Sequence, residues 1–234
     1  MNYSKELILC IEQKRACIGV VGLGYVGLPL VLSFVEAGFN VIGFDINQDI
    51  VDLINSGKSH INHIQDDLID AAINAAVLSC TTDFCDVLKV DALILCVPTP
   101  LNKYREPDLS YITASVASAL PFFRPGQILS IESTTYPGTT DEVVLPMLSK
   151  QGFTIGTDFF LIYSPEREDP GNQEFTSSMI PKVLGGITKN CLEIGKALYK
   201  TYARQVFPVG STRVAEMSKL LENIHRAVNI GLMN

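Results

Sequence analysis

Residues 18–45 read IGVVGLGYVGLPLVLSFVEAGFNVIGFD and decide the fold. An apolar, β-branched run at 18–21 predicts a buried strand, and a similar run at 41–44 predicts a second one. Between the two runs, Gly22, Gly24 and Gly27 have G-x-G-x-x-G spacing and lead into an apolar helical stretch. The segment therefore predicts a strand, a glycine turn, a helix and a second strand in direct succession.

This order of elements is typical of a dinucleotide-binding turn. The first glycine permits a tight turn, the second lets a pyrophosphate approach the backbone, and the third lets the helix pack closely on the strand. The amides and the positive dipole end at the start of the helix attract phosphate. The alternative is an ordinary βαβ unit in which the three glycines serve only packing.

Asp45 follows the second predicted strand, 18 residues after Gly27. A carboxylate in this place can accept hydrogen bonds from the hydroxyls of a ribose. It would repel a 2′-phosphate, and residues 46–50 (INQDI) contain no Arg or Lys to bind one. The sequence therefore predicts NAD, in preference to NADP, as the cofactor.

The composition bounds the remaining possibilities. The chain has 234 residues, 47% of them hydrophobic, and a formal net charge of −7, so it can bury a core and lacks the basic surface of a nucleic-acid-binding protein. No apolar run is long enough to cross a membrane, and residues 1–16 are typical of a leading helix and not of a secretory signal. Six cysteines without a C-x-x-C pair, with only three histidines, argue against a metal site and for reduced thiols in a cytoplasmic protein.

Strands and helices continue to alternate after Asp45. We expect strands at 77–81, 92–97, 127–131, 159–163, 183–184 and 206–209, and helices at 48–56, 66–76, 110–120, 139–149 and 189–202. This alternation predicts an α/β fold of the Rossmann type, a doubly wound and mostly parallel sheet with helices on both faces. Ligands bind beyond the carboxyl ends of such strands, where Gly22–Gly27, Asp45, Thr99, Glu132–Thr135 and Glu166 fall.

Residues 211–234 predict one long amphipathic connecting helix. One side carries the apolar stripe Val214, Met217, Leu221, Ile224 and Val228. The other side carries Glu216, Lys219, Asn223 and Arg226, and Lys219 and Asn223 are spaced so that both can reach one ligand. The alternative is a solvated polar face held by ion pairs such as Glu216–Lys219. We expect residues 1–210 to form the cofactor-binding domain and 211–234 to begin a helix that leads to a further domain or a partner.

Several longer motifs occur in a fixed order along the chain: GLGYVGLPL, CVPTPLNKYREPDLSYI, ESTTYPGTT, YSPEREDPGN, KVLGG and KLLENIHRAVNIGLMN. Together they resemble the UDP-glucose/GDP-mannose dehydrogenase family over residues 14–234, and the bacterial enzymes for UDP-N-acetylglucosamine in particular. The resemblance implies oxidation of the C6 alcohol of a UDP-sugar to a carboxylate with two molecules of NAD. UDP-glucose stays an alternative substrate.

The resemblance also implies roles for particular residues. Gly22, Gly24 and Gly27 would form the pyrophosphate turn, with amides from Tyr25 and Val26, and Asp45 would bind the ribose. Thr99 and Thr135 would line the cofactor and substrate site, and Thr135 would also help to hold a catalytic water. Glu166 would serve as a base or in hydrolysis, and Lys219 and Asn223 would stabilise the developing alkoxide and orient the substrate.

The sequence departs from the family in one respect. The family's nucleophilic cysteine lies in a G-x-G-G-x-C segment of a second, UDP-sugar-binding domain, and no such segment occurs here. Since a thiolate is needed to trap the intermediate aldehyde, we expect this chain alone to be inactive. Two alternatives stay open: a non-catalytic module that binds NAD or forms a homodimer through the 211–234 helix, and a two-electron reductase that needs only this domain.

Overall fold

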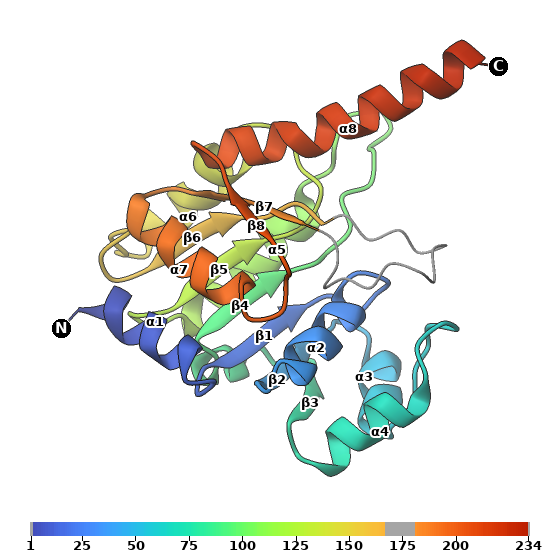
Figure 1. Ribbon diagram of the computed structural model, residues 1–234, viewed down its shortest axis with the longest axis vertical. Helices are drawn as coiled ribbons and strands as arrows, with labels where there is room; N and C mark the ends of the chain where they lie inside the picture. Colours follow the sequence, from blue (N-terminus) through green and yellow to red (C-terminus); the bar gives the residue numbers. More distant parts are fainter. Residues whose placement is uncertain (1, 167–180, 234) are drawn as a thin grey trace.

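The computed structural model describes residues 2–166 and 181–233. Within these ranges eight strands form one sheet in the order β3-β2-β1-β4-β5-β6-β7-β8 (Figure 1). The strands are β1 Cys17–Val21, β2 Asn40–Phe44, β3 Leu78–Thr81, β4 Ala92–Leu95, β5 Ile128–Ile131, β6 Phe160–Tyr163, β7 Lys182–Gly186 and β8 Val206–Pro208. The α-helices are α1 Tyr3–Glu12, α2 Gly27–Glu36, α3 Gln48–Asn55, α4 Asp66–Asn74, α5 Ser110–Ala119, α6 Leu145–Lys150, α7 Lys189–Tyr199 and α8 Thr212–Met233.

The sheet is mostly parallel, as the alternating sequence pattern predicts. β1 lies between β2 and β4, and all pairs from β3 to β6 are parallel. The pair β6·β7 is antiparallel, whereas β7·β8 is again parallel, with α7 as its crossover. The carboxyl ends of β1 to β6 therefore meet at one edge, which is the edge that the glycine turn and Asp45 occupy.

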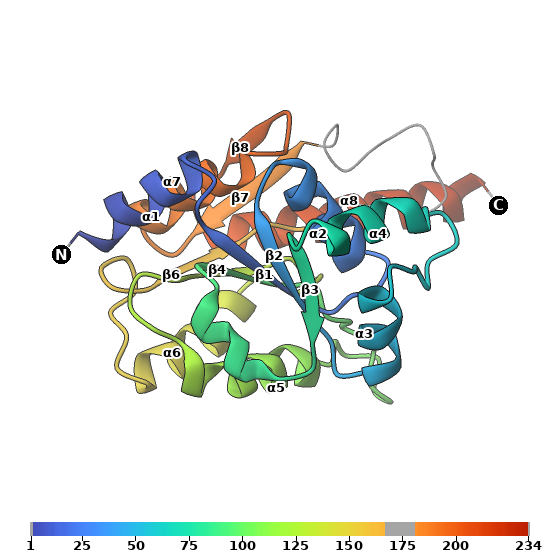
Figure 2. The same ribbon diagram turned by 90° about the horizontal axis from the view of Figure 1, so that it is seen from below.

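Helices cover both faces of the sheet, and the sheet separates the core into two parts (Figure 2). Apolar side chains of α1, α2, α4 and α7 pack with one face of β1, β2, β4 and β6. On the other face, α5 and α6 pack with the alternate residues of these strands, and Ala215 from the start of α8 joins them. Strands buried on both sides explain why the strand segments read as continuous apolar runs. The expected doubly wound α/β fold is confirmed.

Most elements begin or end within a few residues of the expected positions, but the helix expected over 139–149 does not form as one α-helix. Residues Thr139–Val144 form a π-helix, labelled η3, and α6 follows it. Gly138, with a φ of 108°, turns the chain into η3. Short 3-10 helices also occur at Phe84–Lys89 (η1) and Leu120–Phe122 (η2), neither of which the apolar pattern predicts.

The long helix α8 has its polar side against the domain. Its first turns contact β7, β6 and η3, and Thr212, Ala215 and Glu216 are buried there. Val214, Met217, Leu221, Ile224 and Val228 are all exposed, so the apolar stripe points away from the domain. The alternative of a solvated polar face is therefore wrong at Glu216. Among the described residues, no helix is long and apolar enough to span a membrane.

Candidate cofactor-binding site

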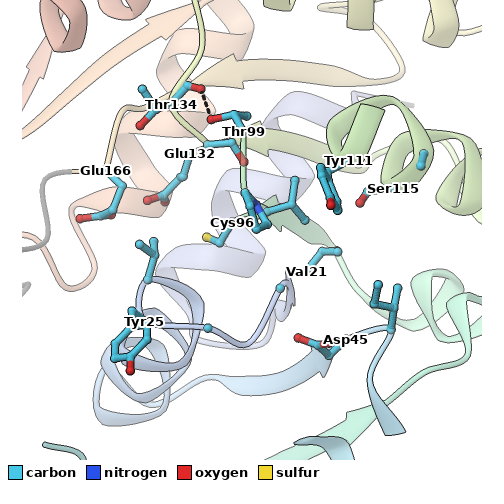
Figure 3. Close-up of a pocket in the computed structure, with 18 of the residues that line it drawn as sticks. Val21, Tyr25, Asp45, Cys96, Thr99, Tyr111, Ser115, Glu132, Thr134 and Glu166 are labelled. Carbon is cyan, nitrogen blue, oxygen red and sulfur yellow. Dashed lines mark hydrogen bonds between the residues drawn. The ribbon is translucent and has the colours of Figure 1, made fainter. Parts of the chain in front are cut away.

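A pocket of about 610 Å³ lies at the carboxyl edge of the sheet (Figure 3). The loops that follow β1, β2, β4, β5 and β6 all contribute to its wall, with one side closed by α5. The expected site residues in this wall are Gly22, Gly24, Tyr25, Val26, Asp45, Thr99 and Glu166. The fold thus brings together residues that lie up to 144 positions apart, counted from Gly22 to Glu166.

The three glycines of the β1–α2 turn have three different surroundings. Gly22 has a φ of 90°, and a Cβ there would lie 2.7 Å from the carbonyl oxygen of Cys96. A Cβ on Gly27 would lie 1.8 Å from the carbonyl oxygen of Gly22, so this residue has to be glycine for α2 to pack on the turn. A Cβ on Gly24 would meet nothing within 4 Å. The backbone at Gly24 is therefore open to a ligand, while its two neighbours in the motif are closed by packing.

The start of α2 offers hydrogen-bond donors to this open space. Within the described parts of the chain, no acceptor is found for the backbone amides of Gly24, Tyr25 and Val26. Helix α2 also begins without a side-chain cap. Unpaired amides at a helix N-terminus, beside an open glycine, form a site for an anion such as a pyrophosphate.

Asp45 is held in a fixed orientation at the end of β2. Its Oδ2 accepts a hydrogen bond of 2.8 Å from the amide of Leu23, and its Oδ1 accepts one of 2.9 Å from the amide of Asn47. The carboxylate therefore joins the glycine turn to the end of β2 and still faces the pocket. Each carboxylate oxygen can accept a second hydrogen bond, so both can bind ribose hydroxyls in this position.

The loops after β4 and β5 form the middle of the pocket. The Thr99 hydroxyl donates a hydrogen bond of 2.6 Å to the carbonyl oxygen of Thr134, which joins the two loops (Figure 3). Ser133 and Thr134 line the pocket, whereas Thr135 is buried behind them and is not part of the wall. The Thr135 hydroxyl has no hydrogen bond among the described residues that meets normal geometry, although it lies near Tyr163.

Two carboxylates, Glu132 and Glu166, line the far end of the pocket, and both contact one buried lysine. Lys182, which begins β7, places its Nζ 2.6 Å from Oε2 of Glu132 and 2.7 Å from Oε2 of Glu166. Tyr199 of α7 donates a hydrogen bond of 2.7 Å to Oε1 of Glu132, and its oxygen lies 2.6 Å from the Ser130 hydroxyl. We call Glu132, Glu166 and Lys182 the acidic triad. Figure 3 shows the Glu132 and Glu166 side chains beside each other, at the end of the pocket opposite to Asp45.

Burial governs the protonation of the acidic triad. Burial raises the pKa of Glu132 to about 8; the Lys182 ammonium opposes this shift and the Glu166 carboxylate adds to it. Burial alone would lower the pKa of Lys182, but the charges of Glu132 and Glu166 outweigh it and hold this pKa well above the ordinary value. The lysine therefore stays charged, and Glu132 takes up a proton at a higher pH than a free carboxyl does.

Three other expected site residues do not line the pocket. Gly27 is enclosed by the turn itself, and Lys219 and Asn223 are partly buried on α8. Glu216, one turn before Lys219, accepts hydrogen bonds from the amides of Gly138 and Thr140 and from the Thr140 hydroxyl at 2.7–2.9 Å. This contact fixes the start of α8 to the loop that carries Thr135. The arginine and later residues of the YSPEREDPGN motif lie outside the described residues.

The sequence pattern gave no role to Lys182 or Tyr199, and it named Glu132 only as one of several polar residues at strand ends. A lysine at the start of an apolar strand is one available signal, because a buried lysine requires an anionic partner. The sequence does not show that this partner is Glu132, 50 positions away. Only the sheet order, with β5, β6 and β7 side by side, brings the two residues together.

The doubly wound sheet, the open glycine turn and the carboxylate after β2 define a dinucleotide-binding protein of the Rossmann type. Residues 16–203 match the model of the "UDP-glucose/GDP-mannose dehydrogenase family, NAD binding domain". The chain belongs to this family, whose members use NAD, and the matched region is its NAD-binding domain.

Individual relatives agree with the family match. The chain is 39% identical over 230 residues to a UDP-N-acetyl-D-glucosamine 6-dehydrogenase of Pseudomonas aeruginosa, covering 95% of this chain and 52% of that protein. Among solved structures, the UDP-N-acetyl-mannosamine dehydrogenase Cap5O of Staphylococcus aureus superposes with a TM-score of 0.85 at 37% identity, over 93% of this chain and 52% of that one. A ternary complex of GDP-mannose dehydrogenase from Pseudomonas aeruginosa superposes with a TM-score of 0.83 at 30% identity. The match covers 91% of this chain and 50% of that one. The chain thus spans about half the length of these relatives.

Proposed function

We propose that the chain is the NAD-binding part of a nucleotide-sugar 6-dehydrogenase, which oxidises the C6 alcohol of a UDP-sugar to the carboxylate. The observation that carries this proposal is the pocket itself, with the open glycine turn and Asp45 at one end and two carboxylates at the other. UDP-N-acetylglucosamine is our favoured substrate, because the Pseudomonas aeruginosa relative is named for it. UDP-glucose is the alternative.

The geometry gives NAD one orientation in this proposal. Asp45 binds the adenosine ribose, and the amides of Gly24, Tyr25 and Val26 bind the pyrophosphate. The nicotinamide end then extends past Thr99 toward Glu132 and Glu166, since these residues close the opposite end of the pocket. NADP is disfavoured because the Asp45 carboxylate faces the place of its 2′-phosphate, as the sequence predicts.

The substrate would meet the cofactor at the acidic end. Thr135 would hold a water, Glu166 would accept a proton, and Lys219 and Asn223 would bind the oxygen on which negative charge develops. The contact of Glu216 with Gly138 and Thr140 supports this arrangement, since it holds the start of α8 against the Thr135 loop. We further propose residues 1–210 as the cofactor-binding domain, 211–234 as the start of a connecting helix, and a cytoplasmic location.

The 234 residues alone would bind NAD without oxidising UDP-sugars, because no glycine-rich segment with a cysteine nucleophile occurs among them. Titration calorimetry with NAD⁺ and NADP⁺ tests the first half of this statement, and NADH formation from UDP-sugars tests the second. We expect binding of NAD⁺ and at least about tenfold weaker binding of NADP⁺. Absence of NAD⁺ binding, or preference for NADP⁺, would refute the proposal.

A second candidate function is a dimerisation module, favoured by the exposed apolar stripe of α8. Sedimentation at several protein concentrations distinguishes the two, because a strict monomer would exclude dimerisation and leave NAD binding untouched.

A further inference from the structure

The acidic triad has an unusual charge balance for a site that faces a cofactor. One buried ammonium contacts two carboxylates, at 2.6 Å and 2.7 Å, so the fully ionised triad carries one net negative charge. The side chains of Lys182, Glu132 and Glu166 are 5%, 0% and 13% exposed, so water screens this charge poorly. One bound proton would make the triad neutral. The number of protons on the triad therefore changes the charge at this end of the pocket.

Several other groups in the described parts of the chain surround Glu132. Tyr199 and Tyr202, from α7 and the residues after it, face Glu132 and Lys182, but burial holds their pKa values well above the ordinary range, and both stay neutral. Ser130 of β5 does not ionise in this range, and Lys182 of β7 stays charged. Glu166, after β6, shares the ammonium with Glu132, and the Cys96 thiol, after β4, lines the same pocket. Burial raises the pKa of Glu132.

The two redox forms of NAD differ in charge at the end that meets the triad. In the proposed function the nicotinamide ring lies beside Glu132 and Glu166, and this ring is cationic in NAD⁺ and neutral in NADH. A cation beside a buried carboxyl favours its ionised form, whereas a neutral ring gives no such preference and further excludes water. The same pocket therefore presents a matching charge to NAD⁺ only after the triad has lost a proton.

We propose that the acidic triad is a proton-linked selector between the two redox forms of the cofactor. Binding of NAD⁺ releases the proton of the triad to solvent, and binding of NADH retains it. The inference rests on the proposed NAD-binding function. Glu132 and Lys182 act in it as positioning residues, through the charge of the triad. It implies that the preference for NAD⁺ over NADH rises with pH over the range in which Glu132 titrates.

Calorimetry of the 234-residue chain in buffers of different ionisation enthalpy tests the proposal, because the dependence of binding heat on the buffer counts the protons released. We expect release of a fraction of a proton on binding NAD⁺ near pH 7.5 and little or none on binding NADH. If NAD⁺ lowers the pKa of the triad by about one unit, NAD⁺ affinity rises about tenfold from acidic to alkaline pH. The NADH affinity should stay flat or fall.

Glu132→Gln is the decisive variant, since it removes the titrating group and keeps an acceptor for Tyr199. It should bind NAD⁺ without proton release and with a flat pH profile. The matched control is Glu193→Gln on α7, whose exposed carboxylate pairs with the half-buried Lys196. This variant should release protons as the unchanged chain does. Carbon-13 NMR of labelled glutamate carboxyls gives a second readout that needs no variant. One carboxyl signal should titrate with a raised midpoint, and addition of NAD⁺ should shift this midpoint to lower pH.

Equal proton release with NAD⁺ and NADH, no release with NAD⁺, or release that persists in Glu132→Gln would each overturn the selector. In these three outcomes NAD⁺ still binds, so the proposed function stands. A chain that binds neither form would refute the proposed function itself, and the calorimetric traces distinguish the two failures directly.

Discussion

The two ends of the pocket are built in opposite ways. At the glycine end, the main chain of a single short segment supplies the site, through the turn at Gly22–Gly27 and the amides that precede α2. At the acidic end, side chains from β5, β7, α7 and the loop after β6 supply it, and they contact one another across the sheet. The first end depends on local conformation and the second on the whole fold. We therefore expect substitutions at the glycine end to act on backbone packing and ligand binding, and substitutions at the acidic end to act on the stability of the whole fold.

The largest effect is expected at the acidic end. Replacing Lys182 with Met leaves two buried carboxylates without their shared cation, and breaking a buried pair in this way costs about 3–5 kcal/mol. Denaturation in urea near pH 8 measures the loss. The control is Lys196→Met, which breaks a partly exposed pair with Glu193 on α7 and should cost about 0–1 kcal/mol. Similar losses in both variants would show that the triad does not stabilise the fold.

The glycine end should respond to a single methyl group in two different ways. Gly27→Ala places a Cβ 1.8 Å from the Gly22 carbonyl oxygen, an overlap of two backbone segments that we expect to cost about 3 kcal/mol of stability. Gly24→Ala meets nothing within 4 Å and should change stability by no more than about 0.5 kcal/mol. Its methyl group occupies the proposed pyrophosphate position instead, so NAD⁺ affinity should fall at least about tenfold, or about 1.4 kcal/mol.

Urea denaturation and NAD⁺ calorimetry on both glycine variants separate packing from binding. Unchanged NAD⁺ affinity in Gly24→Ala, with the protein folded, would mean that the pyrophosphate lies elsewhere.

The contrast between the ends also explains what the sequence could predict. The glycine end follows from residues 18–45 alone, since each part of the motif is a neighbour of the next along the chain. The fold class follows from the regular alternation of apolar strands and helices. Both predictions depend on periodicity and local conformation, which a single sequence displays.

The acidic end could be predicted only in part. Glu132 and Glu166 fall after predicted strands. The contacts of Lys182 and Tyr199 with Glu132 can be predicted only once the strand order β5-β6-β7 is known. The outward direction of the apolar stripe on α8 has the same origin. Glu216 is drawn inward by the amides of Gly138 and Thr140, and the hydrophobic pattern of a helix does not encode a polar partner from another element.

Asp45 lies at the glycine end but acts through its side chain, so it tests whether that end depends on main chain alone. Asp45→Ala removes the expected partner of the ribose and also the acceptor for the amides of Leu23 and Asn47. We expect NAD⁺ binding to weaken about tenfold, because hydrogen bonds to a charged group contribute about 1.5–3 kcal/mol and water replaces part of this. The control is Asp52→Ala on the exposed side of α3, whose carboxylate bonds only Gln48 among the described residues.

Calorimetry with NAD⁺ and NADP⁺ on both aspartate variants provides the measurement. A cofactor preference that is the same in Asp45→Ala and in the unchanged chain would remove the role of this carboxylate in selecting NAD.

The smallest expected effect is a pH dependence of stability that belongs to the acidic end alone. The pKa of Glu132 is raised from 4.5 to about 8 on folding, so between these values the folded chain binds more protons than the unfolded chain. The contribution of Glu132 is therefore fully present below pH 4.5 and is lost as the pH rises toward 8. A full proton would give a slope of about 1.4 kcal/mol per pH unit, and the sharing of charge with Lys182 and Glu166 reduces this to about 0.5.

Urea denaturation from pH 5 to pH 9 gives the free energy of unfolding of the unchanged chain and of Glu132→Gln. The difference between these two free energies gives the slope that belongs to Glu132, because the contributions of the other carboxylates are the same in both proteins. Glu193→Gln serves again as the control and should leave the slope unchanged. A difference that rises with pH, or that is zero throughout, would mean that Glu132 is ionised in the folded chain at neutral pH, and the acidic end would then carry a fixed negative charge. Gly24→Ala leaves the acidic triad intact and should keep the slope of the unchanged chain.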